Sequence, residues 1–188
     1  MKTCFNSLSP ELIRHRKSVQ ELCRQFSRSP SKGNLKRLKA LFHSCGEDVF
    51  IESGFHMDYG DNITLGDRVF INVNCTIVDG KRAETKIADN ERLTHGKISI
   101  GNDCLIGPNV QFLAVSHDVD PQCRLAKHNY VDDIIIGNNV WLGGGVIILA
   151  GIIIGDNAVI GAGSVVTKNV DKQSFYAGNP ARKVRTLE

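Results

Sequence analysis

An aliphatic residue returns at every sixth position over much of this chain, and a small or polar residue follows it. Eight such pairs are Leu65-Gly66, Ile71-Asn72, Ile100-Gly101, Ile106-Gly107, Ile136-Gly137, Leu142-Gly143, Ile154-Gly155 and Ile160-Gly161. A period of six is the pattern of a three-sided parallel β-solenoid, in which each block forms one strand and three blocks complete one coil. An amphipathic helix would instead space its apolar residues three and four apart. The sequence therefore predicts a mainly β solenoid that turns at its small residues.

Composition agrees with a single solenoid of medium size. Hydrophobic residues make up 41% of the 188 residues but aromatic residues only 6%, as expected for a narrow core of aliphatic side chains. The N-terminus has no apolar stretch of signal-peptide length, and the longest apolar run, VIILAGIII from Val146, is too short to cross a bilayer. We therefore expect a cytoplasmic protein without membrane insertion.

The cysteines indicate packing rather than a disulfide framework. No two of the six form a CxxC pair, and Cys75 and Cys104 stand at the small-residue position of the six-residue period. We expect these two to be buried thiols that behave as small hydrophobic side chains.

Residues 1–45 are predicted to form a helical arm and residues 46–188 the solenoid domain. Ser9 and Pro10 predict a helix start, Pro30 and Gly33 its end, and a second short helix is expected to run on to Gly46. The six-residue period breaks at 80–97 and 118–133, which we interpret as loop excursions. The final segment, SFYAGNPARKVRTLE, loses the period and is expected to cap the open end of the coil.

The arm is basic, with ten lysines and arginines against Glu11 and Glu21. It lacks interleaved aromatic residues and any nucleic-acid-binding motif, so we expect a solvated helical face, or one that attracts a phosphorylated cofactor, and no nucleic-acid partner.

Of the six histidines, His117 alone is placed by the pattern at the end of a coil, where the second excursion begins. An imidazole, whose unperturbed pKa is about 6.5, can accept a proton at neutral pH. Position alone leaves two roles open for His117, a general base or a residue that ends a strand.

Several motifs together resemble one enzyme family. The segments CTIVD, IGNDCLIGPNVQFLAVSHDVDPQCR, IIIGNNVWLGGGVIILAGIIIGDNAVIGAGSVVTKNV and AGNPARKVR are similar to the hexapeptide-repeat O-acetyltransferases of the maltose, galactoside and nodulation-factor group. The resemblance covers residues 46–188 closely and the arm loosely. It implies a left-handed parallel β-helix, a homotrimer with active sites between neighbouring solenoids, and transfer of an acetyl group from acetyl-CoA to a saccharide hydroxyl. No metal is expected.

The same resemblance assigns roles to residues on the acceptor side. It implies that His117 is the general base and that Asn72 binds the acceptor and steadies the reacting groups. Asp58 and Phe70 match further acceptor positions, and Asn129 or Tyr130 matches a lid. The alternatives are corner stacking for Asn72 and core packing for Phe70. The family's acidic residue in the first helix has no counterpart here, and the 80–97 excursion is an insertion, so the acceptor's identity stays open.

On the cofactor side the resemblance implies three groups of residues. The first two line the pantetheine arm with a tryptophan and with small residues, and the third meets the phosphates. They are Trp141, Gly143 and Gly144, then Ala162 and Gly163, then Thr167, Lys168, Arg182 and Arg185. The alternative for the cations is a solvated C-terminal tail.

Three other functions stay possible at this point. An antibiotic O-acetyltransferase would share the repeat and a loop excursion. A metal-dependent hydro-lyase would need three converging ligands, of which only His117 is well placed. A non-catalytic solenoid would bind no coenzyme A.

Overall fold

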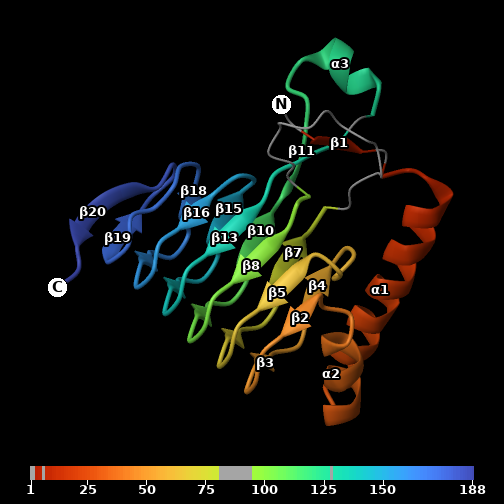
Figure 1. Cartoon of the computed structure of the whole chain (residues 1–188), viewed down its shortest axis with the longest axis horizontal. Coiled ribbons are helices and arrows are strands. Elements are labelled where there is room, and N and C mark those ends of the chain that lie inside the picture. The colour runs from red at the N-terminus through yellow and green to blue at the C-terminus, as the bar shows by residue number, and fades with distance from the viewer. Residues whose placement is uncertain (1–2, 6, 81–94, 128) are drawn as a thin grey trace, which may run out of the picture.

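A three-sided coil of short parallel strands forms the body of the molecule (Figure 1). The computed structural model describes residues 3–5, 7–80, 95–127 and 129–188. Within this part of the chain, each coil contributes one strand to each of three parallel sheets, so that strands three apart along the coil are hydrogen-bonded neighbours. The predicted mainly β solenoid is confirmed.

The strands group by sheet. Sheet I holds β2 (Ser44–Cys45), β5 (Ile63–Leu65), β8 (Ile98–Ile100), β13 (Ile134–Ile136) and β16 (Ile153–Ile154). Sheet II holds β3 (Phe50–Ile51), β6 (Phe70–Ile71), β9 (Leu105–Ile106), β14 (Trp141–Leu142) and β17 (Val159–Ile160), and then β19 (Ser174–Ala177) and β20 (Arg182–Thr186). Sheet III holds β4 (His56–Met57), β7 (Thr76–Val78), β10 (Gln111–Leu113), β15 (Ile147–Leu149) and β18 (Val165–Val166).

The core is a stack of aliphatic side chains along the coil axis. In the five two-residue strands of sheet II the second residue is buried and lies in register with the next, in the column Ile51, Ile71, Ile106, Leu142 and Ile160. Cys75 and Cys104 are buried as expected, and burial raises the pKa of each thiol to about 11. Both therefore stay protonated at neutral pH and act as packing residues.

The corners depend on small residues for a reason other than the predicted one. Gly143 does not adopt a positive φ, but a Cβ there would lie 2.6 Å from the backbone nitrogen of Ala162 in the next coil. The left-handed backbone falls two residues later along the corner, for example at Gly145 with φ 69° and at Asn109 with φ 59°. The glycine of the repeat therefore permits close stacking of the coils, and the following left-handed residue makes the turn.

Two helices cover the first coils. Helix α1 (Pro10–Arg28) begins as predicted, because the Ser9 hydroxyl accepts a hydrogen bond from the Leu12 N–H. Helix α2 (Lys32–Lys39) ends seven residues before the predicted Gly46, since the chain there turns into β2 and the His43 N–H donates to the Gly60 carbonyl. Strand β2 thus precedes residue 46, and the division of the chain at that point stays a prediction.

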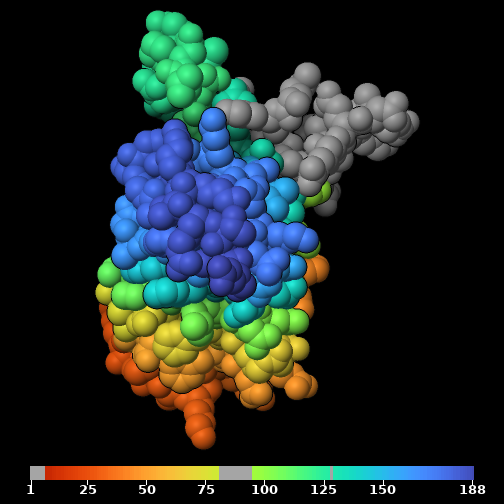
Figure 2. Space-filling view, turned by 90° about the vertical axis from the view of Figure 1, so that its left-hand side faces the viewer, coloured from red at the N-terminus to blue at the C-terminus, as the bar shows by residue number. Residues whose placement is uncertain are grey.

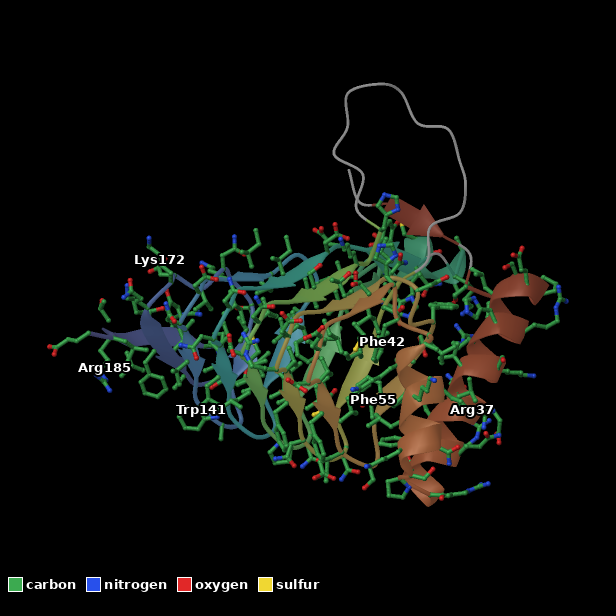
Figure 3. All side chains as sticks on the ribbon, turned by 60° about the horizontal axis from the view of Figure 1, so that its bottom comes forward. Arg37, Phe42, Phe55, Trp141, Lys172 and Arg185 are labelled. Atoms are coloured by element: carbon green, nitrogen blue, oxygen red, sulfur yellow. The ribbon has the colours of Figure 1, made fainter. Side chains whose placement is uncertain are left out.

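The helices share one core with the coil. Val19, Cys23 and Phe26 of α1 are buried together with coil residues. Figure 3 shows Phe42 and Phe55 between the helices and the first coils, and their rings meet edge to face with centroids 6.1 Å apart. Arg37 of α2 points away from this contact (Figure 3), whereas Arg16 of α1 donates to the Tyr59 hydroxyl at 3.2 Å.

The second excursion carries a small sheet of its own. After β10 the chain forms β11 (Val115–His117), the short helix α3 (Pro121–Leu125) and β12 (Asn129–Val131) before it rejoins sheet I. Strand β12 pairs antiparallel with β11 on one side and with β1 (Thr3–Phe5) on the other, which brings the N-terminus to this end of the fold (Figure 1). Helix α3 stands out from the body of the coil (Figure 2). The predicted 80–97 excursion lies mostly outside the described residues.

The C-terminal segment closes the C-terminal end of the coil, as predicted. Strand β19 continues sheet II in parallel with β17, and β20 folds back antiparallel on β19.

Candidate active site

His117 lies in the excursion and not on the coil as the repeat pattern predicted. The coil strand β10 ends at Leu113, and His117 is the last residue of β11, where it pairs with Asn129 of β12. The prediction failed because β11 continues the apolar pattern of β10 without a glycine or proline between them. An antiparallel hairpin, rather than a coil strand, therefore holds the candidate base, and its side chain is exposed.

The partner of His117 in this hairpin is fixed by the N-terminal segment. Asn129 is 5% exposed, and its Nδ2 donates to the Ser7 Oγ at 2.7 Å. Strand β1 pairs with the same strand of the hairpin. Residues from the start of the chain thus support the candidate site, a contact that sequence analysis missed because the pairing spans more than 120 residues.

A cavity of about 310 Å³ opens beside the base. It is lined by Ser7, Leu8, His117, Arg124, Lys127 and Asn129, and we call it the His117 cavity. Of these residues only His117 and Asn129 were predicted to belong to the site. Arg124 and Lys127 were missed, because nothing in the spacing of the excursion indicates that α3 turns back over the end of β11.

The two candidate lid residues face different surroundings. Asn129 lines the His117 cavity, whereas Tyr130 lines a second cavity of about 270 Å³ between the hairpin and the coil, beside Leu113, Leu149 and Ala150. The Tyr130 hydroxyl donates to Asp118 Oδ2 at 3.1 Å. Consecutive residues of a strand point to opposite faces, which accounts for the difference.

Asp58 belongs to a polar cluster near α1, apart from the residues that line the His117 cavity. Its Oδ1 accepts a hydrogen bond from Gln20 Nε2 at 3.3 Å and lies 3.7 Å from His56 Nε2. The next two backbone N–H groups, of Tyr59 and Gly60, donate to the two carboxylate oxygens of Asp79 at 2.9 and 2.8 Å. Asp79 therefore fixes the backbone that carries Asp58.

Asp79 gives a prediction for stability against pH. The residue is fully buried, and burial raises the pKa of its carboxyl from the usual value near 4 to about 7. The folded state then holds a proton that the unfolded state has lost between about pH 4 and about pH 7, so the free energy of unfolding falls as pH rises through that window. In urea unfolding at about pH 5 and about pH 8, the wild type should lose more stability than Asp79→Asn.

The exposed Asp48→Asn variant controls for the general loss of a carboxylate. Equal losses in the wild type and Asp79→Asn would show that Asp79 does not titrate in this range.

Phe70 and Asn72 lie on sheet II and at the corner that follows it. Phe70 points outward and stacks on Phe50 with ring centroids 5.4 Å apart, so the core alternative for Phe70 is wrong. Asn72 Oδ1 accepts a hydrogen bond from the Val73 N–H at 2.8 Å. Asn72 does not line the His117 cavity.

The predicted cofactor residues continue along the same sheet. Trp141 lies on the outer face of β14, 54% exposed, in a ladder that we call the outer ladder: Phe50, Phe70, Leu105, Trp141, Val159 and Phe175. Gly143 and Gly144 follow Trp141 at the corner, and Gly143 stacks on Ala162 of the next coil. No heavy atom lies within 4 Å of a Cβ built at Gly163, which leaves the corner surface open.

The predicted phosphate-binding cations lie beyond the end of the outer ladder. Arg185 pairs with Phe175, and Arg182 pairs with Ala177 on the same strand. Both arginines are exposed, as are Thr167 and Lys168 after β18. Figure 3 shows Trp141 and Arg185 on the outside of the coil toward its C-terminal end. Lys183, between the two arginines, is engaged with Asp171 at 2.9 Å.

The predicted site residues of one chain thus form two separate groups. His117, Asn129 and Tyr130 belong to the hairpin that leaves sheet III, whereas Phe70, Asn72, Trp141 and the glycine corner belong to sheet II. Sheet III lies between them, and a three-residue strand such as β10 spans about 10 Å.

Comparison with known proteins identifies the family. Residues 133–168 match the family model of the bacterial transferase hexapeptide (six repeats), and residues 97–111 match that of the hexapeptide repeat of succinyl-transferase. The galactoside O-acetyltransferase of Escherichia coli K12 is 34% identical over 186 residues, which are 97% of this chain and 84% of that protein. A maltose O-acetyltransferase from Clostridium difficile 630 is 34% identical in its crystal structure, with a TM-score of 0.87 over 100% of this chain and 94% of that one.

The chain belongs to the hexapeptide-repeat acetyltransferase family. A family member from Vibrio cholerae, solved with acetyl coenzyme A, is 30% identical, with a TM-score of 0.83 over 98% of this chain and 93% of that one. The chain is accordingly an acetyl-CoA-dependent acetyltransferase, and its three-sided coil is the left-handed parallel β-helix of this family. These findings exclude the hydro-lyase and the non-catalytic solenoid as its main function.

Two further observations concern the described residues. Among them, no group of three or more histidine, cysteine, aspartate or glutamate side chains is arranged to hold a metal ion. No helix in the same part of the chain is long and apolar enough to span a membrane.

Proposed function

We propose that this acetyltransferase acetylates a hydroxyl of a sugar or glycoside, with His117 as the general base. The observation that carries the proposal is the position of His117, exposed at a cavity and held by a hairpin whose other strand is fixed by the Asn129–Ser7 hydrogen bond. The relatives named for galactoside and maltose support a saccharide acceptor.

The chemistry follows from what an imidazole can do at that place. Acetyl-CoA supplies the acetyl group as a thioester, which an alcohol attacks slowly while it keeps its proton. His117 takes that proton as the hydroxyl oxygen bonds to the carbonyl carbon, the bond from carbon to sulfur breaks, and the thiolate leaves and is then protonated. A well-placed base contributes about a hundred- to ten-thousandfold to such a step. Transfer is direct, and no acetyl group is carried by the protein.

Asn72 has a supporting role in this proposal. Its amide offers both a donor and an acceptor, so Nδ2 can bind the acceptor while Oδ1 is held by the Val73 N–H. Phe70 and Asp58 are proposed to contact the acceptor as well, and Asn129 and Tyr130 to form the lid.

The cofactor is proposed to lie along the outer ladder and the glycine corner. Trp141 and the corner of small residues at Gly143, Gly144, Ala162 and Gly163, which is open at Gly163, suit a slender pantetheine arm, because small side chains leave the peptide groups accessible. Thr167, Lys168, Arg182 and Arg185 are exposed near the C-terminal end and are proposed to bind the phosphates.

A complete site then requires a second copy of the chain, and we propose a homotrimer. Two features support this: His117 and the proposed cofactor residues are separated on one chain, and the outer ladder is apolar and open. Phe50 is 48% exposed and Leu105 is 53% exposed, an unusual pair of large apolar side chains on one sheet face. In the trimer His117 of one chain would meet the cofactor held by its neighbour.

The proposed function is tested by following the release of free coenzyme A thiol from acetyl-CoA with a panel of neutral and charged mono- and disaccharides. We expect thiol release that depends on the sugar, with an O-acetyl product identified by mass spectrometry. Chloramphenicol and a streptogramin test the antibiotic alternative. Transfer to either antibiotic and to none of the sugars would contradict the proposal.

A further inference from the structure

The wall of the His117 cavity that α3 contributes is cationic. Arg124 is on α3, and Lys127 follows the end of the helix, where its φ of 58° turns the chain toward β12. Both side chains are exposed and line the same cavity as His117. The other lining residues, Ser7, Leu8 and Asn129, carry no charge, so the described lining contains two permanent cations and no carboxylate.

The position of the Arg124 guanidinium is fixed without neutralising its charge. Its Nη1 donates to the backbone carbonyls of Asp118 and Val119 at 3.2 and 3.3 Å. Neutral carbonyls orient the group but leave its charge uncompensated. Three of the five guanidinium N–H donors, on Nε and Nη2, remain for a ligand, in the planar fork that suits a phosphate or a carboxylate.

The acidic side chains of the excursion are engaged elsewhere. Asp118 Oδ2 accepts a hydrogen bond from the Tyr130 hydroxyl, and its Oδ1 accepts one from the Asp120 N–H. Asp120 Oδ1 accepts from the Gln122 and Cys123 N–H groups and caps α3. Among the residues that the structure describes, neither Arg124 nor Lys127 forms an ion pair.

We propose that Arg124 and Lys127 bind an anionic group of the acceptor, so that the preferred acceptor is a negatively charged saccharide. This inference rests on the proposed function and narrows its substrate class. The anionic group is a phosphate or a carboxylate, which the same fork of donors binds. A cavity of about 310 Å³ is at the small end of ligand sites and suits one charged sugar unit.

The competing role for these cations is to hold the phosphates of the cofactor. The proposed arrangement argues against it: the part of the neighbour's cofactor that meets His117 is the thioester, at the opposite end of the pantetheine arm from the phosphates, which are proposed to lie at Arg182 and Arg185 on β20. The experiment below distinguishes binding of the acceptor from binding of the cofactor phosphates, because it measures KM for the sugar and KM for acetyl-CoA.

The test compares three derivatives of the glucopyranose ring that differ in charge. Methyl α-D-glucopyranoside is neutral, α-D-glucose 1-phosphate carries a phosphate, and methyl α-D-glucuronopyranoside carries a carboxylate. For the wild type we expect kcat/KM to be at least about tenfold higher for one charged sugar than for the neutral one. Whether the phosphate or the carboxylate gives the higher value identifies the kind of anion.

Arg124→Gln with Lys127→Gln should lower that preference by at least about tenfold, through KM for the charged sugar. Lys127→Glu, which brings the summed charge of these two positions from +2 to 0, should abolish the preference. Lys36→Gln, an exposed cation on α2, is the matched control and should leave the preference unchanged.

The outcomes are distinguishable. If the neutral glucoside is used as well as both charged sugars, or if the double variant raises KM for acetyl-CoA instead, the inference fails while the proposed function stands. If none of the three sugars accepts an acetyl group, the proposed function fails and the inference fails with it.

Discussion

His117→Ala should lower the turnover number for acetyl transfer by at least about a hundredfold. The variant removes the only group in our proposal that takes the proton from the acceptor hydroxyl. The side chain is exposed at the end of β11, so its loss leaves no cavity in the core, and the circular dichroism spectrum and oligomeric mass should match those of the wild type. The measurement is the initial rate of thiol release at saturating acetyl-CoA and acceptor.

His43→Ala is the matched control for this prediction. His43 is exposed beside the first coil strand, and its backbone N–H, which the substitution keeps, makes the contact with Gly60. The control should turn over at the wild-type rate. A His117→Ala enzyme as active as His43→Ala would show that another group, or water, takes the proton.

Phe112→Ala should lower the free energy of unfolding by about 3–5 kcal/mol. Phe112 is fully buried in β10, in register between Ile77 of β7 and Ile148 of β15, so the neighbouring coils cannot close over the space that the ring leaves. It also lies directly before the point where the excursion leaves the coil. Urea unfolding followed by circular dichroism measures the effect.

Val119→Ala serves as the comparison, because Val119 is 91% exposed and should change the free energy of unfolding by less than about 0.5 kcal/mol. A loss below about 1 kcal/mol for Phe112→Ala would mean that the coil collapses around the missing ring or that this part of the core is loosely packed.

The period of six was sufficient to predict the coil, because every six-residue block must supply one inward aliphatic side chain followed by a small or polar residue. Ile71 and Leu142 each sit over an identical position one coil away, so one local rule determines the register of the whole stack. The Ser9 cap of α1 was equally local. The end of α2 was not, since it depends on a hydrogen bond from His43 to Gly60, which belongs to the coil.

The candidate site was predictable only in part, because some of its contacts join segments that lie far apart in the sequence. The outward position of Trp141 follows from the alternation along β14. The hairpin of β11 and β12, and its third strand β1, depend on pairings across the excursion and across the whole chain, which no periodicity reports. Arg124 and Lys127 reach His117 only through that hairpin, so their role emerged from the structure.

The resemblance to the family predicted chemistry that spacing could not. Acetyl-CoA as the co-substrate is confirmed by the relatives. The roles of the individual site residues, the homotrimer and the acceptor stay predictions.

The most direct test of the account is a crystal structure with coenzyme A and a sugar that the enzyme acetylates. We predict a sugar hydroxyl within hydrogen-bond reach of the His117 imidazole, about 2.6–3.2 Å, with the coenzyme A sulfur of the neighbouring chain's site on the other side of that hydroxyl. A sulfur far from every His117 ring in the assembly, with the sugar bound elsewhere, would contradict the central claim.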